Sequence, residues 1–297
     1  MQALLAARPS VLSLAETHYF EHLFGHFDDW LYENPRAQRK WASRLSLARG
    51  WTHGKLTRSL SDALDPSLPA ARLHRRLTGR GYVREFADAL DILARQLGCS
   101  VWIEKSPDHL AYIDILAELI PDAQFIHVIR NGEDVVSSAI EGQLQYHDQG
   151  VFRGGLDYWV QRWNRAARVH LRYAGNPRHL VVPHEALIAR PDDAGRALAD
   201  FAGLDSESVV VATARSTSRI ADALCEPWKR SALDGVVRPL TRKFESLFGP
   251  RLRQLISSRL DDYTEIRHRL AKAQAGQAWL APGSTAFNPA SAMRYRR

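Results

Sequence analysis

The sequence predicts an α/β protein: a three-layer arrangement with a mostly parallel sheet and helices on both of its faces. The order of strand-length and helix-length segments supports this class. Between residues 82 and 204, short apolar runs of strand length alternate with amphipathic segments of helix length. No internal repeat is present. Strands that alternate with helices in this way form parallel sheets.

The clearest alternation lies between residues 101 and 138. VWIE at 101–104 is a short apolar run, and Ser106 followed by a proline is typical of a helix start. A second apolar run, QFIHVI at 124–129, precedes Asn131, a helix cap with Asp134 as a weak capping box. Because one helix separates the two runs, a right-handed crossover should make them parallel neighbours.

The remaining elements follow from the same patterns. We expect amphipathic helices at 82–97 and 155–173, a strand at 179–183, a helix from Pro191 to a stop before Gly203, and helix again at 237–260. Residues 1–8 read as the end of a helix. We expect one domain over residues 1–275, in which 24–80 is a variable insertion suited to substrate specificity, and a loose tail at 276–297.

Composition narrows the class of protein. The net charge is +7 over 297 residues, which suits an anionic ligand, and the hydrophobic share of 45% contains no run that could span a membrane. The positive charge is scattered without a nucleic-acid-binding motif, so we do not expect nucleic acid as a partner. Cys99 and Cys225 are too few for a disulfide framework, which favours a cytoplasmic location.

Polar residues follow the two central runs where ligands bind in parallel sheets, at the carboxyl ends of the strands. Arg130 closes the second run, Ser138 lies eight residues later, and Lys105 closes the first. Guanidinium and hydroxyl donors in this arrangement can hold a phosphate. In the plainer alternative, Arg130 pairs with Glu133 or Asp134, and the other two side chains lie on the surface.

Four segments, RNGEDVVSS at 130–138, the block at 179–204, WKRSAL at 228–233 and IEKSP at 103–107, resemble motifs of the sulfotransferases that use 3′-phosphoadenosine 5′-phosphosulfate (PAPS). The resemblance covers most of residues 1–260. Within the family, AARPSVLSLAETHYF at 6–20 is most similar to tyrosylprotein-type and related bacterial members.

The resemblance implies a role for each matching residue. Glu16 would be the catalytic base, and Lys105 would lie near the transferred sulfuryl group. Arg130 and Ser138 would bind the 3′-phosphate of the cofactor, and no metal would be needed. Further cofactor contacts would come from Ser216 and Thr217 on the adenosine side, and from Trp228 and Lys229 in a closing loop.

The sequence departs from the family pattern at three places. The first strand and its Gly-x-Pro-Arg-Ser-Gly-Thr-Thr loop, which in this P-loop-like fold binds the 5′-phosphosulfate, are missing; we expect a reading frame truncated at an internal Met, or else a natural loss. His184 replaces a tyrosine that stacks near the adenine, so a contact there is doubtful. Pro107 replaces the base histidine of many members, which favours a carboxylate base, for which Glu104 and Glu185 are weaker rivals of Glu16.

His18, His22 and His26 recur every four residues. Such a row can bind zinc, but Gly25 weakens the helix and no His-Glu-x-x-His arrangement is present. Contact with an acidic acceptor or simple surface placement is the favoured interpretation.

The expected function is sulfuryl transfer from PAPS to a hydroxyl, or less readily an amine, of a small-molecule, glycan or peptide acceptor. A non-catalytic nucleotide-binding relic or scaffold protein is the alternative. A kinase-like phosphoryl transferase is disfavoured because no Asp suited to Mg²⁺ follows an apolar strand. The acceptor and the oligomeric state stay open.

Overall fold

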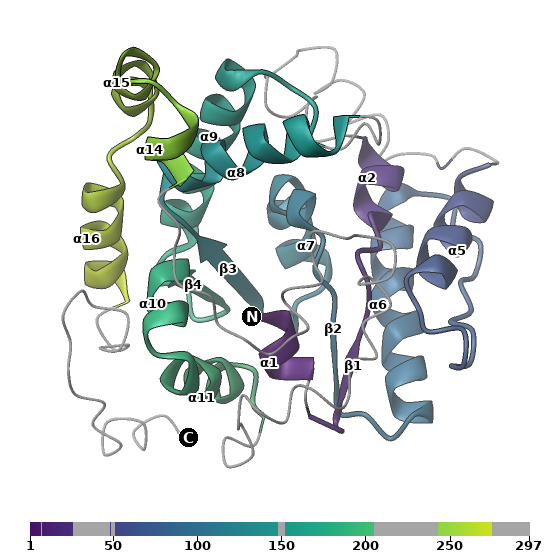
Figure 1. Ribbon diagram of the computed structural model, residues 1–297. Coiled ribbons are helices and arrows are strands. Elements are labelled where there is room, and N and C mark those ends of the chain that lie inside the picture. The colour runs from purple at the N-terminus through teal and green to yellow at the C-terminus, as the bar shows by residue number, and fades with distance from the viewer. Residues whose placement is uncertain (7, 26–47, 49–50, 148–151, 205–242, 275–297) are drawn as a thin grey trace. The chain divides into compact units, whose positions relative to one another are not determined.

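The computed structural model describes residues 1–6, 8–25, 48, 51–147, 152–204 and 243–274 (Figure 1). The chain divides into two compact units, each of which is described here by itself. Unit 1 comprises residues 1–123 and 198–237, and unit 2 comprises residues 124–197 and 238–297.

Unit 1 is built around two parallel strands, β1 (Val11–Ser13) and β2 (Val101–Ile103). Val11 pairs with Val101 and Ser13 with Ile103, so the two strands end at the same level. Strand β1 was not predicted, although its residues are all buried. Within the described residues β2 pairs with β1, and the strand over 124–129 pairs with another strand in unit 2. The expectation that 101–104 and 124–129 are neighbours stays a prediction.

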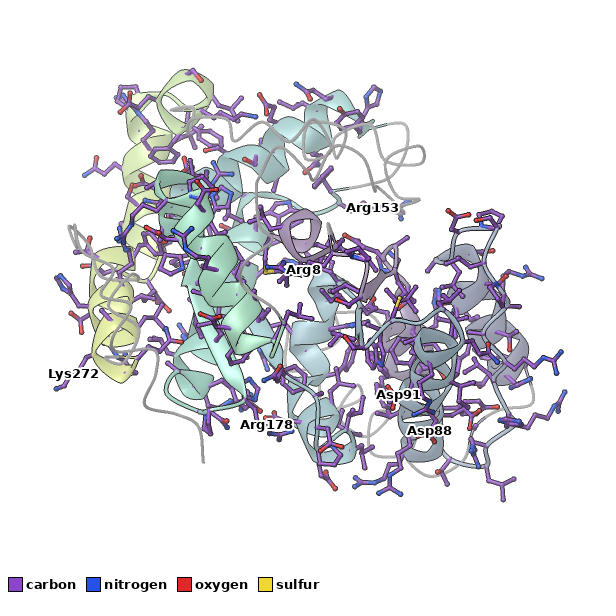
Figure 2. The ribbon with its side chains drawn as sticks, turned by 90° about the horizontal axis from the view of Figure 1, so that it is seen from below. Arg8, Asp88, Asp91, Arg153, Arg178 and Lys272 are labelled. Atoms are coloured by element: carbon purple, nitrogen blue, oxygen red, sulfur yellow. The ribbon has the colours of Figure 1, made fainter. Side chains whose placement is uncertain are left out.

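The helices of unit 1 are α1 (Gln2–Ala6), α2 (Tyr19–Phe24), α5 (Thr52–Asp62), α6 (Gly79–Gln96), the 3-10 helix η1 (Pro107–Tyr112) and α7 (Ile113–Leu119). Helix α6 begins where the Thr78 hydroxyl accepts a hydrogen bond from the Gly81 amide. Its buried face includes Phe86, whose ring lies edge-on to Trp102 of β2. The Trp102 indole N–H donates to Asp91 on the same helix, labelled in Figure 2.

Unit 2 contains a second parallel pair, β3 (Phe125–Ile129) and β4 (His179–Pro183). The helices that lie wholly in this unit are α8 (Gly132–Gln145), α9 (Leu156–Tyr173), α10 (His184–Ala189), α14 (Lys243–Leu247), α15 (Pro250–Arg259) and α16 (Tyr263–Ala273) (Figure 1). Helix α11 (Pro191–Phe201) begins in unit 2 and ends in unit 1. One buried cluster joins β3, β4, α9 and α16 through Ile129, Val181, Trp163 and Leu270.

Three histidines lie together in the interior of unit 2. The His127 ring is within 3.0 Å of His170 through one nitrogen and within 3.0 Å of His179 through the other. Tyr173 stacks on His179 with the ring centroids 4.2 Å apart. Burial, and then the other histidines, lower the pKa of His127 to about 2, and burial lowers that of His170 to about 4. The His127 and His170 rings are therefore neutral at physiological pH.

The α/β class is confirmed, because parallel strands and helices make up both units. The predicted helices at 82–97 and 155–173 and the strand at 179–183 are present as α6, α9 and β4. Asn131 caps α8 as predicted, but Ser106 makes no capping hydrogen bond. The predicted tail at 276–297 lies outside the described residues, and the single domain stays a prediction. Among the described helices, none has both the length and the apolar character needed to cross a membrane.

Candidate active site

The shared end of β1 and β2 brings Glu16 and Lys105 together. Glu16 is the third residue after Ser13, and Lys105 is the second after Ile103, so the parallel register delivers both to one edge. The Lys105 ammonium donates to the Glu16 carboxylate as an ion pair. The Glu16 side chain is 10% exposed and that of Lys105 is 32% exposed. The two residues predicted to be catalytic are thus in direct contact at the rim of unit 1.

His18 is a further neighbour of this pair that the sequence did not single out for such a role. Its Nε2 lies 3.6 Å from Glu16, and its Nδ1 lies 2.7 Å from Glu21. The hydrogen bond to Glu21 is the main cause that raises the pKa of His18 to about 8, against the opposing effect of burial; Glu21 and Glu16 also raise it by their charge. His18 is therefore largely protonated at neutral pH and adds a second cation beside Glu16.

The backbone at His18 is held in an uncommon conformation. Its φ of 48° and ψ of 22° are left-handed, which is rare outside glycine although histidine tolerates it better than most residues. The His18 amide donates to the Ser106 hydroxyl over 3.1 Å, which fixes this turn at the end of β2. His18 therefore precedes α2 instead of lying on its face, and the predicted row of histidines does not form: His22 is in α2, and His26 lies outside the described residues.

Glu104, a rival for the role of base, is enclosed by hydrogen-bond donors. Its carboxylate accepts from the Ser106 hydroxyl at 2.6 Å and the Thr17 hydroxyl at 2.9 Å, and it pairs with His109 at 2.8 Å. Burial pushes the pKa of Glu104 up, but His109 and the hydroxyl donors outweigh it and lower this pKa to about 2. A carboxylate that is this fully occupied supports the turn carrying Glu16 and is poorly suited to accept a proton.

In unit 2, Arg130 directly follows β3, as predicted. Its Nη2 and Nε lie 3.3 and 3.4 Å from one Asp134 oxygen. These distances exceed the 2.7–2.9 Å usual for charge-assisted bonds, so Asp134 holds the guanidinium only loosely. The Arg130 carbonyl accepts from the Trp163 indole at 2.9 Å. A side chain at Gly132 would come within 2.9 Å of Trp163, so glycine permits this close packing.

Glu185 fixes the same turn from the side of β4. One of its oxygens accepts the Asn131 amide at 3.1 Å, and the other accepts the Tyr263 hydroxyl. Burial and the bond to Glu185 raise the pKa of Tyr263. With both oxygens engaged, Glu185 positions the turn after β3, which weakens it as a candidate base.

The other predicted cofactor ligands have different outcomes. Ser138 is half-buried two turns along α8, and its hydroxyl makes no hydrogen bond to a described residue, whereas its neighbour Ser137 bonds back to Glu133. Ser216, Thr217, Trp228 and Lys229 lie outside the described residues. Within the described part of the chain, no group of three metal-ligating side chains is arranged so that it could hold a metal ion.

His184 begins α10 immediately after β4. Its Nδ1 is buried and has no hydrogen-bond partner in the part of the chain that the structure describes. Burial first, and then the charge of Arg130, lower the pKa of His184, while Glu185 and Asp134 act in the opposite direction. Arg130 is therefore close enough to His184 to affect its charge.

Comparison with known proteins gives one family. The model of the sulfotransferase family matches residues 1–208. Among solved structures, the sulfotransferase domain from the curacin biosynthetic pathway is similar, with a TM-score of 0.40 and 15% identity over 86% of this chain and 90% of that domain. No curated protein matches the chain.

Proposed function

The chain belongs to the sulfotransferase family, and on that premise we propose that it transfers a sulfuryl group from PAPS to a hydroxyl. The acceptor would be a small molecule, a glycan or a peptide, and an amine is a less suitable nucleophile. The observation that carries this proposal is the contact of Glu16 with Lys105 at the carboxyl ends of β1 and β2. A carboxylate and an ammonium there are the two groups that in-line transfer to a hydroxyl requires.

Glu16 would accept the proton of the attacking hydroxyl. Help of this kind from a general base is worth roughly 10²–10⁴-fold in rate. Lys105 would leave Glu16 for the oxygen that gains charge as the sulfuryl group departs, where a compact ammonium is effective. The ion pair holds both groups at the same edge until the substrates separate them.

Arg130 and Ser138 would bind the 3′-phosphate of the donor. The fit is supported by two features of unit 2: the guanidinium is held only loosely by Asp134, and the Ser138 hydroxyl has no partner among the described residues. The Trp163 and Glu185 contacts fix the backbone on which Arg130 stands. The donor supplies the sulfuryl group, and these residues supply its orientation.

Transfer of labelled sulfate from PAPS to a panel of hydroxyl acceptors tests the proposal. Glu16→Gln should reduce the rate by about 10²-fold or more with little effect on binding of the product, 3′-phosphoadenosine 5′-phosphate (PAP). Lys105→Ala should also reduce the rate. Glu118→Gln is the matched control, because this carboxylate forms an exposed ion pair with Arg80 elsewhere in unit 1. Failure of the wild-type protein to bind PAP would contradict the proposal, and binding without transfer to any acceptor would favour a non-catalytic nucleotide-binding protein.

A further inference from the structure

Parallel register places His184 next to Arg130. Ile129 of β3 pairs with Pro183 of β4, and these are the last residues of the two strands. Arg130 and His184 therefore leave the sheet side by side, on strands about 4.8 Å apart. The effect of Arg130 on the pKa of His184 agrees with this placement.

The hydrogen bonds of His184 are incomplete. Nδ1 is buried and has no hydrogen-bond partner among the described residues. Glu185, the nearest carboxylate in sequence, has both oxygens engaged by Asn131 and Tyr263. A neutral imidazole has one donor and one acceptor nitrogen, and a buried donor without an acceptor is costly. Because no described acceptor faces the buried Nδ1, we assign the proton of the neutral ring to Nε2. The ring then offers an N–H donor next to a guanidinium, with no acceptor from the described residues.

From this placement we propose that His184 is a third ligand of the phosphate held by Arg130, donating its Nε2–H to a phosphate oxygen. The inference rests on the proposed function and deepens it, because it assigns a contact to the 3′-phosphate and not to the adenine ring. A phosphate has enough oxygens to accept from Arg130, Ser138 and His184 together. A neutral donor also adds no second positive charge beside Arg130.

Two substitutions distinguish a hydrogen bond from ring stacking. His184→Gln keeps an N–H donor but loses the ring, and His184→Phe keeps the ring but loses the donor. We expect His184→Phe to weaken PAP binding by about tenfold or more, the usual effect of losing one hydrogen bond to a charged group. His184→Gln should retain most of the affinity. The reverse order, with Phe retained and Gln weakened, would overturn the proposal in favour of stacking.

Ligands that carry their phosphate at different positions show which phosphate His184 contacts. His184→Phe should weaken PAP and adenosine 3′-phosphate by the same factor and leave adenosine 5′-phosphate unchanged. An equal loss for adenosine 5′-phosphate, or no loss for any ligand, would overturn the proposal. His268→Phe, which alters an exposed histidine of α16 in the same unit, is the matched control and should have no effect.

The outcomes also separate this inference from the proposed function. If the wild-type protein binds PAP and Arg130→Ala abolishes binding while His184→Phe does not alter it, only the role of His184 is wrong. If the wild-type protein does not bind PAP, both are wrong. Thermal unfolding of each unligated variant shows whether it is folded, and His184→Ala provides a second variant without the donor if the Phe variant is not.

Discussion

The two units differ in how the charged residues at their strand ends are paired. Each ends a pair of parallel strands with charged residues at one edge. In unit 1 the charges satisfy one another: Glu16 pairs with Lys105, and buried Glu104 is surrounded by donors. In unit 2 the cation at the strand end is held loosely, and its neighbour His184 has no partner among the described residues. The first arrangement holds a carboxylate and an ammonium in place. Under the proposed function, the second leaves donors for the phosphate of the cofactor.

The largest effect should follow from removing the Glu104 carboxylate, which accepts several hydrogen bonds in unit 1. Glu104→Ala removes a buried carboxylate and leaves His109, Ser106 and the Thr17 hydroxyl without their acceptor. We expect it to lower the free energy of unfolding by about 3–5 kcal/mol, as when one partner of a buried ion pair is removed. Chemical denaturation measures this loss. Glu118→Ala, whose side chain is 59% exposed, should cost less than about 1 kcal/mol; equal losses for the two variants would contradict the contrast.

How far this contrast was predictable from sequence depends on distance along the chain. Arg130 and the cap at Asn131 follow from local patterns, and both are where the sequence placed them. The Glu16–Lys105 contact joins residues that are 89 positions apart. The family resemblance gave each a role, but their contact depends on β1, which has only three residues and carries too little periodicity to recognise.

The predicted pairing of 101–104 with 124–129 also goes beyond what local patterns support. The crossover rule fixes the handedness of a connection between parallel strands, but it does not require them to be adjacent. Likewise, the left-handed turn at His18 and the histidine cluster around His127 depend on tertiary contacts that no local pattern reports.

The second effect is a dependence of stability on pH that differs between the two units. In unit 2, burial lowers the pKa values of His127 and His170 to about 2 and about 4, and the other charges that act on His127 are His170 and His179. In the unfolded state the pKa of each of these two histidines is about 6.5. Above that pH both rings are neutral in the folded and the unfolded state, so proton binding does not favour unfolding. As the pH falls, the unfolded state binds protons that the folded state excludes, at a cost on the order of 2 kcal/mol for each histidine by pH 5.

Unit 2 should therefore lose stability between pH 6.5 and 5. Hydrogen exchange of the β3 and β4 amides as a function of pH measures this loss in unit 2 alone. In His170→Phe, the slope of stability against pH should fall by about one proton, whatever the stability of the variant at neutral pH. An unchanged slope would show that His170 is protonated in the fold.

The third effect tests the loose cation of unit 2. Arg130→Lys keeps the positive charge but loses the planar fork that binds two phosphate oxygens at once. We expect PAP affinity to fall by about tenfold, the equivalent of one charge-assisted bond, as measured by calorimetric titration. Arg168→Lys alters an exposed arginine paired with Asp261 in the same unit and should leave affinity unchanged. Full affinity in Arg130→Lys would mean that Arg130 acts only as a point charge.

The smallest effect concerns unit 1, in which the stability contributed by His18 should fall as the pH rises. This is opposite to the pH dependence expected for unit 2. His18 has a folded pKa of about 8, raised by its hydrogen bond to Glu21. Its pairing with Glu21 and Glu16 therefore stabilises the fold fully below about pH 6.5, the unfolded pKa, and this contribution is lost as the pH rises through 8. Because the side chain is 44% exposed, we expect less than about 1 kcal/mol. His18→Asn removes the charge while retaining a residue that tolerates the left-handed turn. The stability difference between wild type and variant, followed by exchange of the β1 and β2 amides, should be largest at pH 6 and smallest at pH 9; a constant difference would mean that His18 acts through its backbone turn and not through its charge.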